Sequence, residues 1–258
     1  QGEEFLAGVD FAYPNSKKVG GLASGAQGPG GNSMYLGDKI YNSGLVGIAL
    51  TGEIEVDTIV AQGCRPIGEP MQITKCEETL LQELEGKPPL EVLQELHETL
   101  SDSDKQLLQT SLFLGIEMDP MKDNPKQGDF LIRNLMGIDR ESGGLAIGTL
   151  LRNGQLVQFH LRDKKMSAED LDVMLTRYLN LGNAENAKGA LLFSCLGRGQ
   201  YLYGEANHDT DMFQNKLGKI PLGGFFCNGE IGPVGNTTFL HGYTSSFGIF
   251  RSPESGAS

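Results

Sequence analysis

Short apolar runs separated by glycine-rich turns fill the first 85 residues, a pattern typical of strands that are buried on both faces. The strands expected from these runs are 5–9, 19–23, 45–50 and 57–61, and residues 25–32 form a glycine-rich loop between them. Residues 71–84 predict paired strands, although Thr74 and Glu77 imitate a helix capping box, because the apolar positions alternate and a Gly-Lys-Pro-Pro turn follows.

Helical spacing of apolar residues begins after Pro88-Pro89, where leucines at 90, 93, 96 and 100 would share one face. Further helices are predicted near 103–110, from Ser167 with Asp170 as its cap partner, and near 210–217, ended by Gly218. The strands expected in this half are 112–116, 145–151, 155–161, 189–194, 222–227 and the stretch 237–250. Asn153-Gly154 predicts a hairpin between 145–151 and 155–161.

These elements together predict an α+β fold of mixed or antiparallel sheets, built from short Gly-rich strands and flanked by helices. The Gly-Gly segment at 19–25 is similar to the one at 222–229, and each precedes a hydrophobic-Gly-Ile run further along the chain. This repeat predicts two pseudo-symmetric halves with equivalent Gly-Gly strands, with chance similarity as the alternative. The helix after Pro88 is the expected boundary between the halves.

Composition restricts the classes of protein and partner. The chain has 258 residues, 39% of them hydrophobic and 21% charged, as in a soluble globular protein with a full core. A net charge of −12 argues against nucleic acid as a partner, because a binder of phosphate backbones needs a basic surface. No apolar run is long enough for membrane insertion. The start at Gln1, without methionine, indicates that further sequence preceded it.

The cysteines indicate a reducing environment. Four are present without C-x-x-C spacing, and we expect four reduced, mostly buried thiols: Cys64, Cys76, Cys195 and Cys227. The expected location is therefore an intracellular reducing compartment, either the cytoplasm or the plastid stroma.

Five stretches carry a resemblance to a known family. They are VGGLASG at 19–25, QGCRPIG at 62–68, GDFLIRNLMGID at 128–139, FSCLGRG at 193–199 and GFFCNGEIGPVG at 224–235. Together they resemble the FIST domain of signalling proteins and some F-box proteins, and the order and wording are most similar to cyanobacterial and plastid-lineage members. The resemblance assigns 1–86 to the C-terminal part of the FIST N-terminal region, 87–251 to the FIST C-terminal region, and 252–258 to a tail. It implies sensing of small ligands such as amino acids, no assigned catalysis, and protein partners.

The loop after strand 189–194 supplies the first candidate site. Cys195 lies at the strand end beside Arg198, where a thiol can become reactive toward electrophiles or oxidants, or can simply fill space as a small hydrophobe. Gly197 and Gly199 would let backbone N–H groups approach a ligand, while Arg198 offers a planar fork for a carboxylate. Alternatively, Arg198 pairs with an internal acid such as Glu230.

The turn Asn228-Gly229-Glu230 supplies the second candidate site. It follows a buried strand, so its side chains are expected at a sheet end, where ligands bind in α/β folds. Glu230 would then take the ammonium group of an amino acid whose carboxylate binds Arg198, with a purely structural turn as the alternative.

No cofactor or metal is expected. Asp209 and Asp211 beside His208 are explained by roles at a helix N-terminus, and the glycine-rich loops lack the residues of a nucleotide-binding motif. The sequence therefore favours a non-catalytic sensing or protein-interaction module, with a small-molecule ligand and a protein partner. The alternatives are an assembly subunit of a larger complex or a thiol-dependent enzyme, which would need a histidine beside Cys195.

Overall fold

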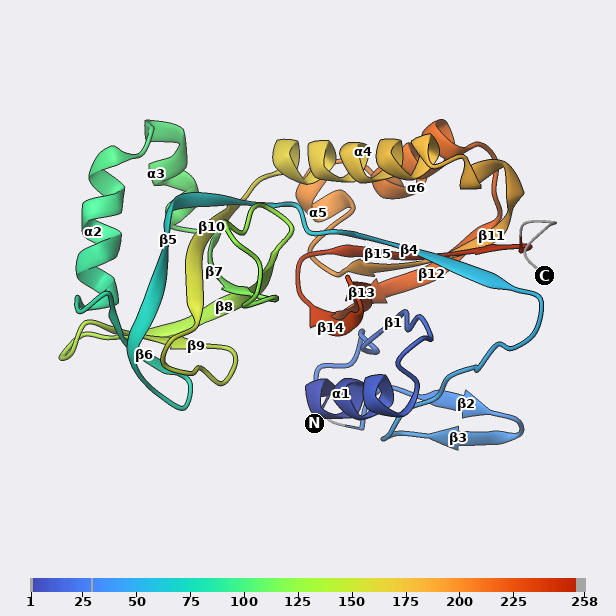
Figure 1. Cartoon of the computed structure of the whole chain (residues 1–258), viewed down its shortest axis with the longest axis horizontal. Coiled ribbons are helices and arrows are strands. Elements are labelled where there is room, and N and C mark those ends of the chain that lie inside the picture. Colours follow the sequence, from blue (N-terminus) through green and yellow to red (C-terminus); the bar gives the residue numbers. More distant parts are fainter. Residues whose placement is uncertain (1, 29, 254–258) are drawn as a thin grey trace. The chain divides into compact units, whose positions relative to one another are not determined.

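The α+β class is confirmed by the computed structural model, which describes residues 2–28 and 30–253 (Figure 1). Within these ranges the chain forms six α-helices and fifteen strands. The chain divides into two compact units, and each is treated by itself below. Unit 1 combines Gln1–Val60 with Asp172–Ser258, and unit 2 is the intervening stretch Ala61–Leu171.

Unit 2 is a closed antiparallel barrel whose strands follow the order β10-β5-β6-β9-β8-β7. The strands are β5 (Cys64–Glu77), β6 (Leu80–Leu84), β7 (Leu112–Glu117), β8 (Phe130–Asp139), β9 (Gly144–Ile147) and β10 (Leu156–Arg162). Closure pairs every strand on both sides, so the barrel has no edge strand. Its interior is a single apolar cluster that includes the fully buried Leu114, Val157 and Phe159.

Two helices of the barrel unit were predicted and are confirmed. Helix α2 (Pro89–Thr99) has its proline in the first turn, where the missing N–H is tolerated, and buries Val92 and Leu93. Helix α3 (Asp102–Leu108) is capped by Ser101, whose Oγ accepts from the backbone N–H of Asp104 at 3.2 Å.

The predicted strand pair in 71–84 is confirmed by β5 and β6, but the predicted hairpin of 145–151 with 155–161 is wrong. β9 pairs with β6 and β8, and β10 pairs with β5 and β7. The turn Asn153-Gly154 instead bonds to β5: Asn153 Oδ1 accepts from the Cys76 N–H at 3.0 Å, and the Gly154 N–H donates to the Ile73 carbonyl at 2.8 Å. Asn153 and Gly154 do form a turn, as predicted, but the strand pairing of the closed barrel places β9 and β10 beside other strands.

The predicted cap of the long helix is also wrong. Helix α4 (Lys164–Asn180) begins before Ser167, and Asp163 caps it by accepting from the Met166 N–H at 2.8 Å. Ser167 Oγ donates to the Gly63 carbonyl at 2.8 Å, and Asp170 accepts from the Gly63 N–H at 3.1 Å. These two side chains therefore bind the chain just ahead of β5.

Unit 1 is built around a four-stranded mixed sheet of order β12-β11-β15-β4, in which β11 and β12 are parallel and β11 and β15 antiparallel. These strands are β4 (Glu55–Ala61), β11 (Ala187–Cys195), β12 (Leu222–Cys227) and β15 (Ser245–Arg251). A second sheet has the order β1-β13-β14, with β1 (Gly20–Gly21), β13 (Glu230–Val234) and β14 (Thr237–His241); a hairpin joins β2 (Met34–Leu36) and β3 (Lys39–Tyr41).

The helices of unit 1 are α1 (Gly2–Ala12), α5 (Gln200–Tyr203), α6 (His208–Leu217), the C-terminal part of α4, and the 3-10 helix Asn183–Asn186. Helix α6 packs on the four-stranded sheet, where the rings of Phe213 and Phe247 stack with centroids 5.3 Å apart (Figure 1). Its end at Gly218 (φ 89°) is confirmed. Tyr178 of α4 donates to Asp57 of β4 at 2.9 Å, which holds α4 to the same sheet.

Two predicted strands of unit 1 are wrong. The run 5–9 lies within α1, because five apolar residues fit a helix as well as a strand and only Leu6 is buried. Residues 45–50 have no regular secondary structure and are exposed, with Ile48 88% accessible.

The two Gly-Gly strands are not equivalent. β1 pairs antiparallel with β13, whereas β12 pairs parallel with β11. The later run 247–249 lies in β15, while 46–48 lies in no strand.

Candidate functional site

A tight turn after β11 forms the site. The Arg198 N–H donates to the Cys195 carbonyl at 2.8 Å, so the chain reverses directly at the strand end. Gly199 follows with φ 65° and ψ −141°, and a Cβ built there would lie 3.0 Å from Cζ of Phe226. Glycine is therefore required here for both conformation and space, and α5 starts immediately after it.

The turn buries the guanidinium of Arg198, which is 1% exposed. Its Nε donates to Asp209 Oδ2 at 2.7 Å, and its Nη2 donates to Asp209 Oδ1 at 3.1 Å and to Tyr203 Oη at 2.6 Å. Within the described residues, the third nitrogen, Nη1, has no hydrogen-bond partner. One buried donor of the site is thus left without a protein acceptor in the described part of the chain.

The carboxylate of Asp209 connects the polar side chains of the site. It lies in the first turn of α6, where the helix dipole favours a negative charge. Besides Arg198 it accepts from Ser245 Oγ at 2.7 Å and Ser194 Oγ at 3.4 Å, and its Oδ1 is 3.1 Å from His208 Nδ1. Burial alone would raise the pKa of Asp209, but the hydrogen bond from His208 and the charge of Arg198 outweigh it and hold the pKa well below its usual range.

A cavity of about 340 Å³ lies next to this ion pair. Its wall combines the polar network with apolar side chains from β11, β12 and the loops around α5. The lining includes Arg198, Leu192, Leu196, Tyr201, Ala206, Asn207 and Phe226. A small pocket that is mostly apolar and has few convergent polar groups is the usual form of a small-molecule site.

The structure separates the sequence-predicted site residues. Arg198 and Gly199 line the cavity, whereas Cys195 and Gly197 are half-buried beside it and are not part of its lining. The partner of Arg198 is Asp209 of α6 and not Glu230.

The second predicted turn lies outside the cavity lining. Asn228 is exposed, and its backbone N–H donates to the Leu22 carbonyl at 3.2 Å. Gly229 has φ 150°, and a Cβ there would lie 3.0 Å from Leu22. Glu230 is fully buried, and its Oε2 accepts from the Thr244 N–H at 3.1 Å and the Thr244 Oγ1 at 2.9 Å.

Sequence reasoning missed the role of Asp209, for which it assigned only a place at a helix N-terminus. It also missed Tyr203 and Ser245, because nothing in the spacing of either residue marks it as a neighbour of Arg198.

Three of the four histidines have partners within the protein. His208 stacks on the Tyr203 ring with centroids 3.5 Å apart and bonds to Asp209. His241 Nε2 is 3.0 Å from the Gly232 carbonyl oxygen, and the fully buried His160 of unit 2 has its Nδ1 2.9 Å from the Gln158 carbonyl oxygen. In residues 2–28 and 30–253, no group of three or more His, Cys, Asp or Glu side chains is arranged to hold a metal ion.

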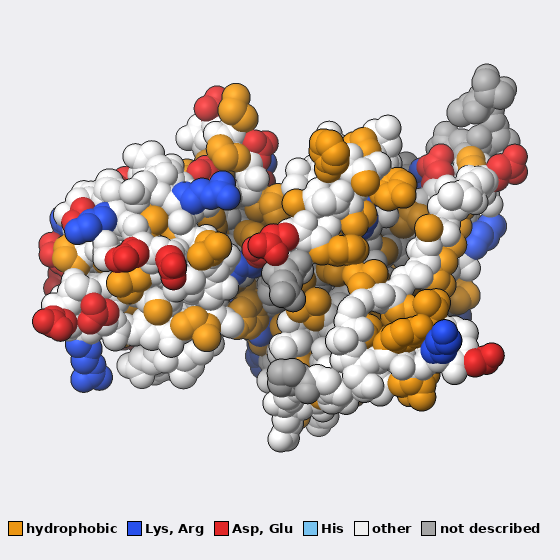
Figure 2. Space-filling view, turned by 90° about the horizontal axis from the view of Figure 1, so that it is seen from below, with side chains coloured by type: hydrophobic (Ala, Val, Ile, Leu, Met, Phe, Trp, Pro, Cys, Tyr) orange, Lys and Arg blue, Asp and Glu red, His pale blue; other side chains and the backbone are white. Residues whose placement is uncertain are grey.

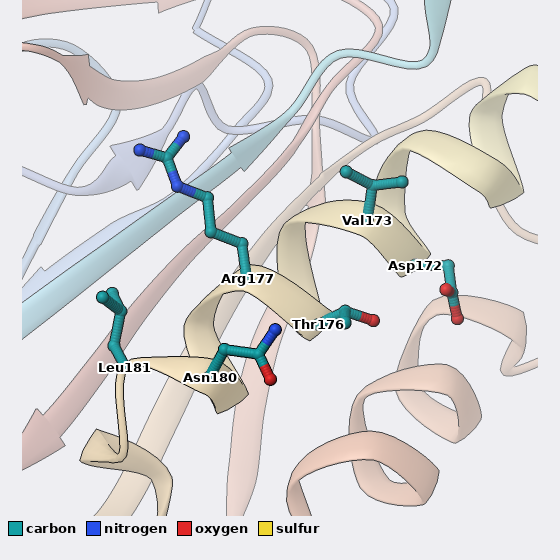
Figure 3. A pocket seen from close by; sticks show the side chains of 6 residues that line it. All are labelled: Asp172, Val173, Thr176, Arg177, Asn180 and Leu181. Atoms are coloured by element: carbon teal, nitrogen blue, oxygen red, sulfur yellow. The ribbon is translucent and has the colours of Figure 1, made fainter.

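A second hollow runs along α4 in unit 1 and measures about 430 Å³ (Figure 3). Its lining comes from one helix and the residue after it: Asp172, Val173, Thr176, Arg177, Asn180 and Leu181. Val173 and Leu181 are more than 60% exposed, and Asp172 is bonded to Lys216 at 2.9 Å. An open surface of this kind removes little water from a ligand, so the cavity beside Arg198 is the stronger candidate.

Comparison with known families adds to this geometry. A model of the FIST N domain matches residues 1–87, and a model of the FIST C domain matches residues 89–233. The chain belongs to the FIST family. FIST domains are generally sensory domains of signal transduction.

Relatives of this FIST chain occur in bacteria and plants. It is 40% identical over 240 residues to an uncharacterized protein of Mycobacterium tuberculosis H37Rv, covering 92% of this chain and 61% of the relative. A Mycobacterium bovis relative, also uncharacterized, has 40% identity over 237 residues with the same coverage. An F-box/LRR-repeat protein of Arabidopsis thaliana is 26% identical over 142 residues, 49% of this chain and 27% of the relative.

The chain spans about three-fifths of the length of the mycobacterial relatives it matches. These relatives do not show the expected similarity to cyanobacterial and plastid-lineage members. Among its described residues, the FIST chain has no helix with the length and apolar character needed to cross a membrane.

Proposed function

We propose that this chain is a non-catalytic sensing module of the FIST type whose cavity beside Arg198 receives a small molecule. One observation carries the proposal: Arg198 lines the cavity, is almost fully buried, and keeps one donor, Nη1, without a partner among the described residues. Leaving a buried donor unsatisfied costs about 1–3 kcal/mol, which a ligand acceptor would recover.

The hydrogen bonds of the site restrict the ligand. The ligand needs an acceptor for Arg198 Nη1, such as a carboxylate or carbonyl oxygen. Both oxygens of Asp209 already accept from protein donors, so they offer little to a ligand ammonium group. Leu192, Leu196 and Phe226 would contact an apolar part of the ligand. The ligand class is therefore a small carboxylate or carbonyl compound, amino acids included, that is held mainly at its acceptor end.

The buried ion pair supplies a rigid platform for such a ligand. Arg198 cannot turn toward solvent, because two of its nitrogens are bonded to Asp209 and Tyr203. A preorganised donor loses little side-chain entropy when a ligand binds. Gly199 also lines the cavity, and Cys195 and Gly197 lie in the same turn outside the lining.

The test is a thermal-shift screen of the purified chain against amino acids, related carboxylates and neutral amides. A ligand at a hundredfold excess over its Kd should stabilise the protein by about 2.7 kcal/mol. Leu196→Trp would fill the cavity without touching the ion pair, since Leu196 is 42% exposed, and should abolish the shift. Leu181→Trp in the α4 hollow is the matched control and should keep it. A shift that survives Leu196→Trp would contradict this site.

A second candidate is a protein-interaction or assembly role, favoured by exposed apolar side chains in residues 34–50. Tyr35, Ile40, Leu45 and Ile48 are each more than 60% exposed. Figure 2 shows hydrophobic side chains on the face that carries α1, β2 and β3. Lysine substitutions at Tyr35 and Ile48 should release a co-purifying partner; an unchanged complex would argue against this surface.

The expected compartment rests on the cysteines. All four are thiols in the structure, which supports a reducing location such as the cytoplasm or the plastid stroma. Fractionation of the source cells tests this location.

A further inference from the structure

Two cysteines end neighbouring parallel strands of unit 1. Cys195 is the last residue of β11, Cys227 is the last residue of β12, and the two are register partners. Adjacent strands lie about 4.7–4.9 Å apart, which falls within the Cα separation of roughly 4.4–6.8 Å found across disulfides. The backbone spacing therefore suits a bond between them.

Their side chains point to the same face of the sheet. Residues two apart on a strand share a face, so Cys195 lies on the face of Phe193 and Cys227 on the face of Phe225. Phe193 and Phe225 are register partners, and their rings meet edge to face with centroids 5.5 Å apart. Burial is the main reason that the pKa of Cys227 rises to about 12, and the charges of Glu230 and Cys195 raise this pKa further. The two cysteines are therefore close enough to interact electrostatically.

The two thiols have different surroundings. Cys195 is half-buried and close enough to Arg198 to interact with its charge. Cys227 is fully buried beneath β1, where a Cβ on Gly21 would lie only 2.1 Å from its Sγ. Solvent and small oxidants therefore reach Cys195 first, and Cys227 is the partner that resolves the oxidised sulfur.

We propose that Cys195 and Cys227 form a reversible disulfide when the protein meets a hydroperoxide. The Cys195 thiolate attacks one peroxide oxygen, the O–O bond breaks, and the products are a sulfenic acid and water or an alcohol. The Cys227 sulfur then attacks the Cys195 sulfur; the S–O bond breaks, and the departing hydroxide leaves as water with the Cys227 proton. Each sulfur loses one electron, and the peroxide gains two.

The bond would join the strand ends that carry part of the cavity wall. Leu196 follows Cys195 and Phe226 precedes Cys227, and both line the cavity. The Leu196 N–H already donates to the Cys227 carbonyl at 2.9 Å, so the two chain segments start in contact. This site is independent of ligand sensing and is tested without any ligand.

The experiment treats the full purified chain with hydrogen peroxide, alkylates the remaining thiols, and digests it with trypsin without reductant. Cleavage at Lys188, Arg198, Lys219 and Arg251 separates the two cysteines onto different peptides. The expected result is a linked pair, 189–198 with 220–251, lighter than the two reduced peptides together by two hydrogen atoms. Dithiothreitol should separate the pair.

Matched variants make the result specific. Cys227→Ala should abolish the linked pair and leave Cys195 as a sulfenic or sulfinic acid, whereas Cys64→Ala and Cys76→Ala should not change it. Two outcomes would overturn the proposal: a wild type that accumulates sulfinic acid at Cys195 as fast as Cys227→Ala does, or a linkage that joins Cys195 of two separate chains.

Discussion

Replacing Asp209 by asparagine should strongly destabilise unit 1. The substitution keeps the size of the side chain but removes the charge that compensates Arg198, which is 1% exposed. The guanidinium would then lie buried beside Tyr203 and a neutral amide. In addition, the asparagine NH₂ would replace one of the two carboxylate oxygens and would face hydrogen-bond donors in place of an acceptor.

The magnitude follows from the burial of the pair. Breaking a buried ion pair by removing one partner costs about 3–5 kcal/mol, because the remaining charge stays uncompensated. With a urea slope of about 2 kcal/mol per molar, the unfolding midpoint of the affected unit should fall by roughly 2 M. Arg198→Met should cost less than Asp209→Asn, since it leaves a carboxylate that still accepts from Ser245 and His208.

The assay combines urea unfolding at pH 7, followed by circular dichroism, with hydrogen exchange read residue by residue. Exchange is needed because two units need not unfold as one, and a single free energy of unfolding would then be ill defined. Amides of β11 and α6 should lose protection, while amides of the barrel serve as an internal control. The double variant Asp209→Asn, Arg198→Met should lose less stability than the sum of the losses of the two single variants, because the two side chains interact directly.

One result would refute this reasoning. If Asp209→Asn lowers the stability of unit 1 by less than about 0.5 kcal/mol, the variant behaves like an ordinary surface substitution, and the Arg198 charge is not buried in solution.

Three further predictions concern close packing and pH. Gly224→Ala should destabilise unit 1 by several kcal/mol or prevent its folding, because the new Cβ would lie 1.9 Å from the Leu192 carbonyl oxygen; Gly223→Ala, whose Cβ would have ordinary contacts, should stay within about 1 kcal/mol in the same melting assay. Burial lowers the pKa of His160 to about 4, so barrel stability should be complete above pH 6.5 and fall by about 3 kcal/mol as the pH drops toward 4. His160→Asn should remove that slope in barrel hydrogen exchange, and a retained slope would assign it to another group. Because the pKa of Asp209 is lowered on folding, its contribution to stability should be complete above its unfolded pKa of about 4 and should shrink steadily as the pH falls below that value. The urea midpoint of the wild type should therefore approach that of Asp209→Asn gradually below about pH 4, and a gap between the two that stays constant on acidification would contradict this.

The sequence predicted those elements whose pattern is set locally. Helix α2 follows from Pro89 and its leucine spacing, and β4 and β7 follow from apolar runs bounded by turns. The α+β class followed from the mixture of such runs. In contrast, residues 5–9 are too few to distinguish a helix from a strand, and they form part of α1.

Contacts between residues that are far apart in the sequence could not be predicted from local patterns. The close contact of Gly224 with the Leu192 carbonyl, for example, comes from the pairing of β12 with β11. Arg198 was singled out as a candidate binding residue, and the structure places it in the lining of a cavity. Its partner could not be read from spacing, because Asp209 lies in a separate helix, α6, and only the folded chain brings it to the guanidinium.

The interrupted chain of unit 1 has a consequence for synthesis on the ribosome. Every strand of the barrel lies within residues 64–162, so the barrel can close as soon as β10 has emerged. β1 and β4, made earlier, must wait for β13 and β15 at 230–251. The nascent chain would thus carry a folded barrel while the segment 30–61, rich in exposed apolar side chains, still lacks its sheet partners. During synthesis that segment would expose apolar surface to which a chaperone could bind.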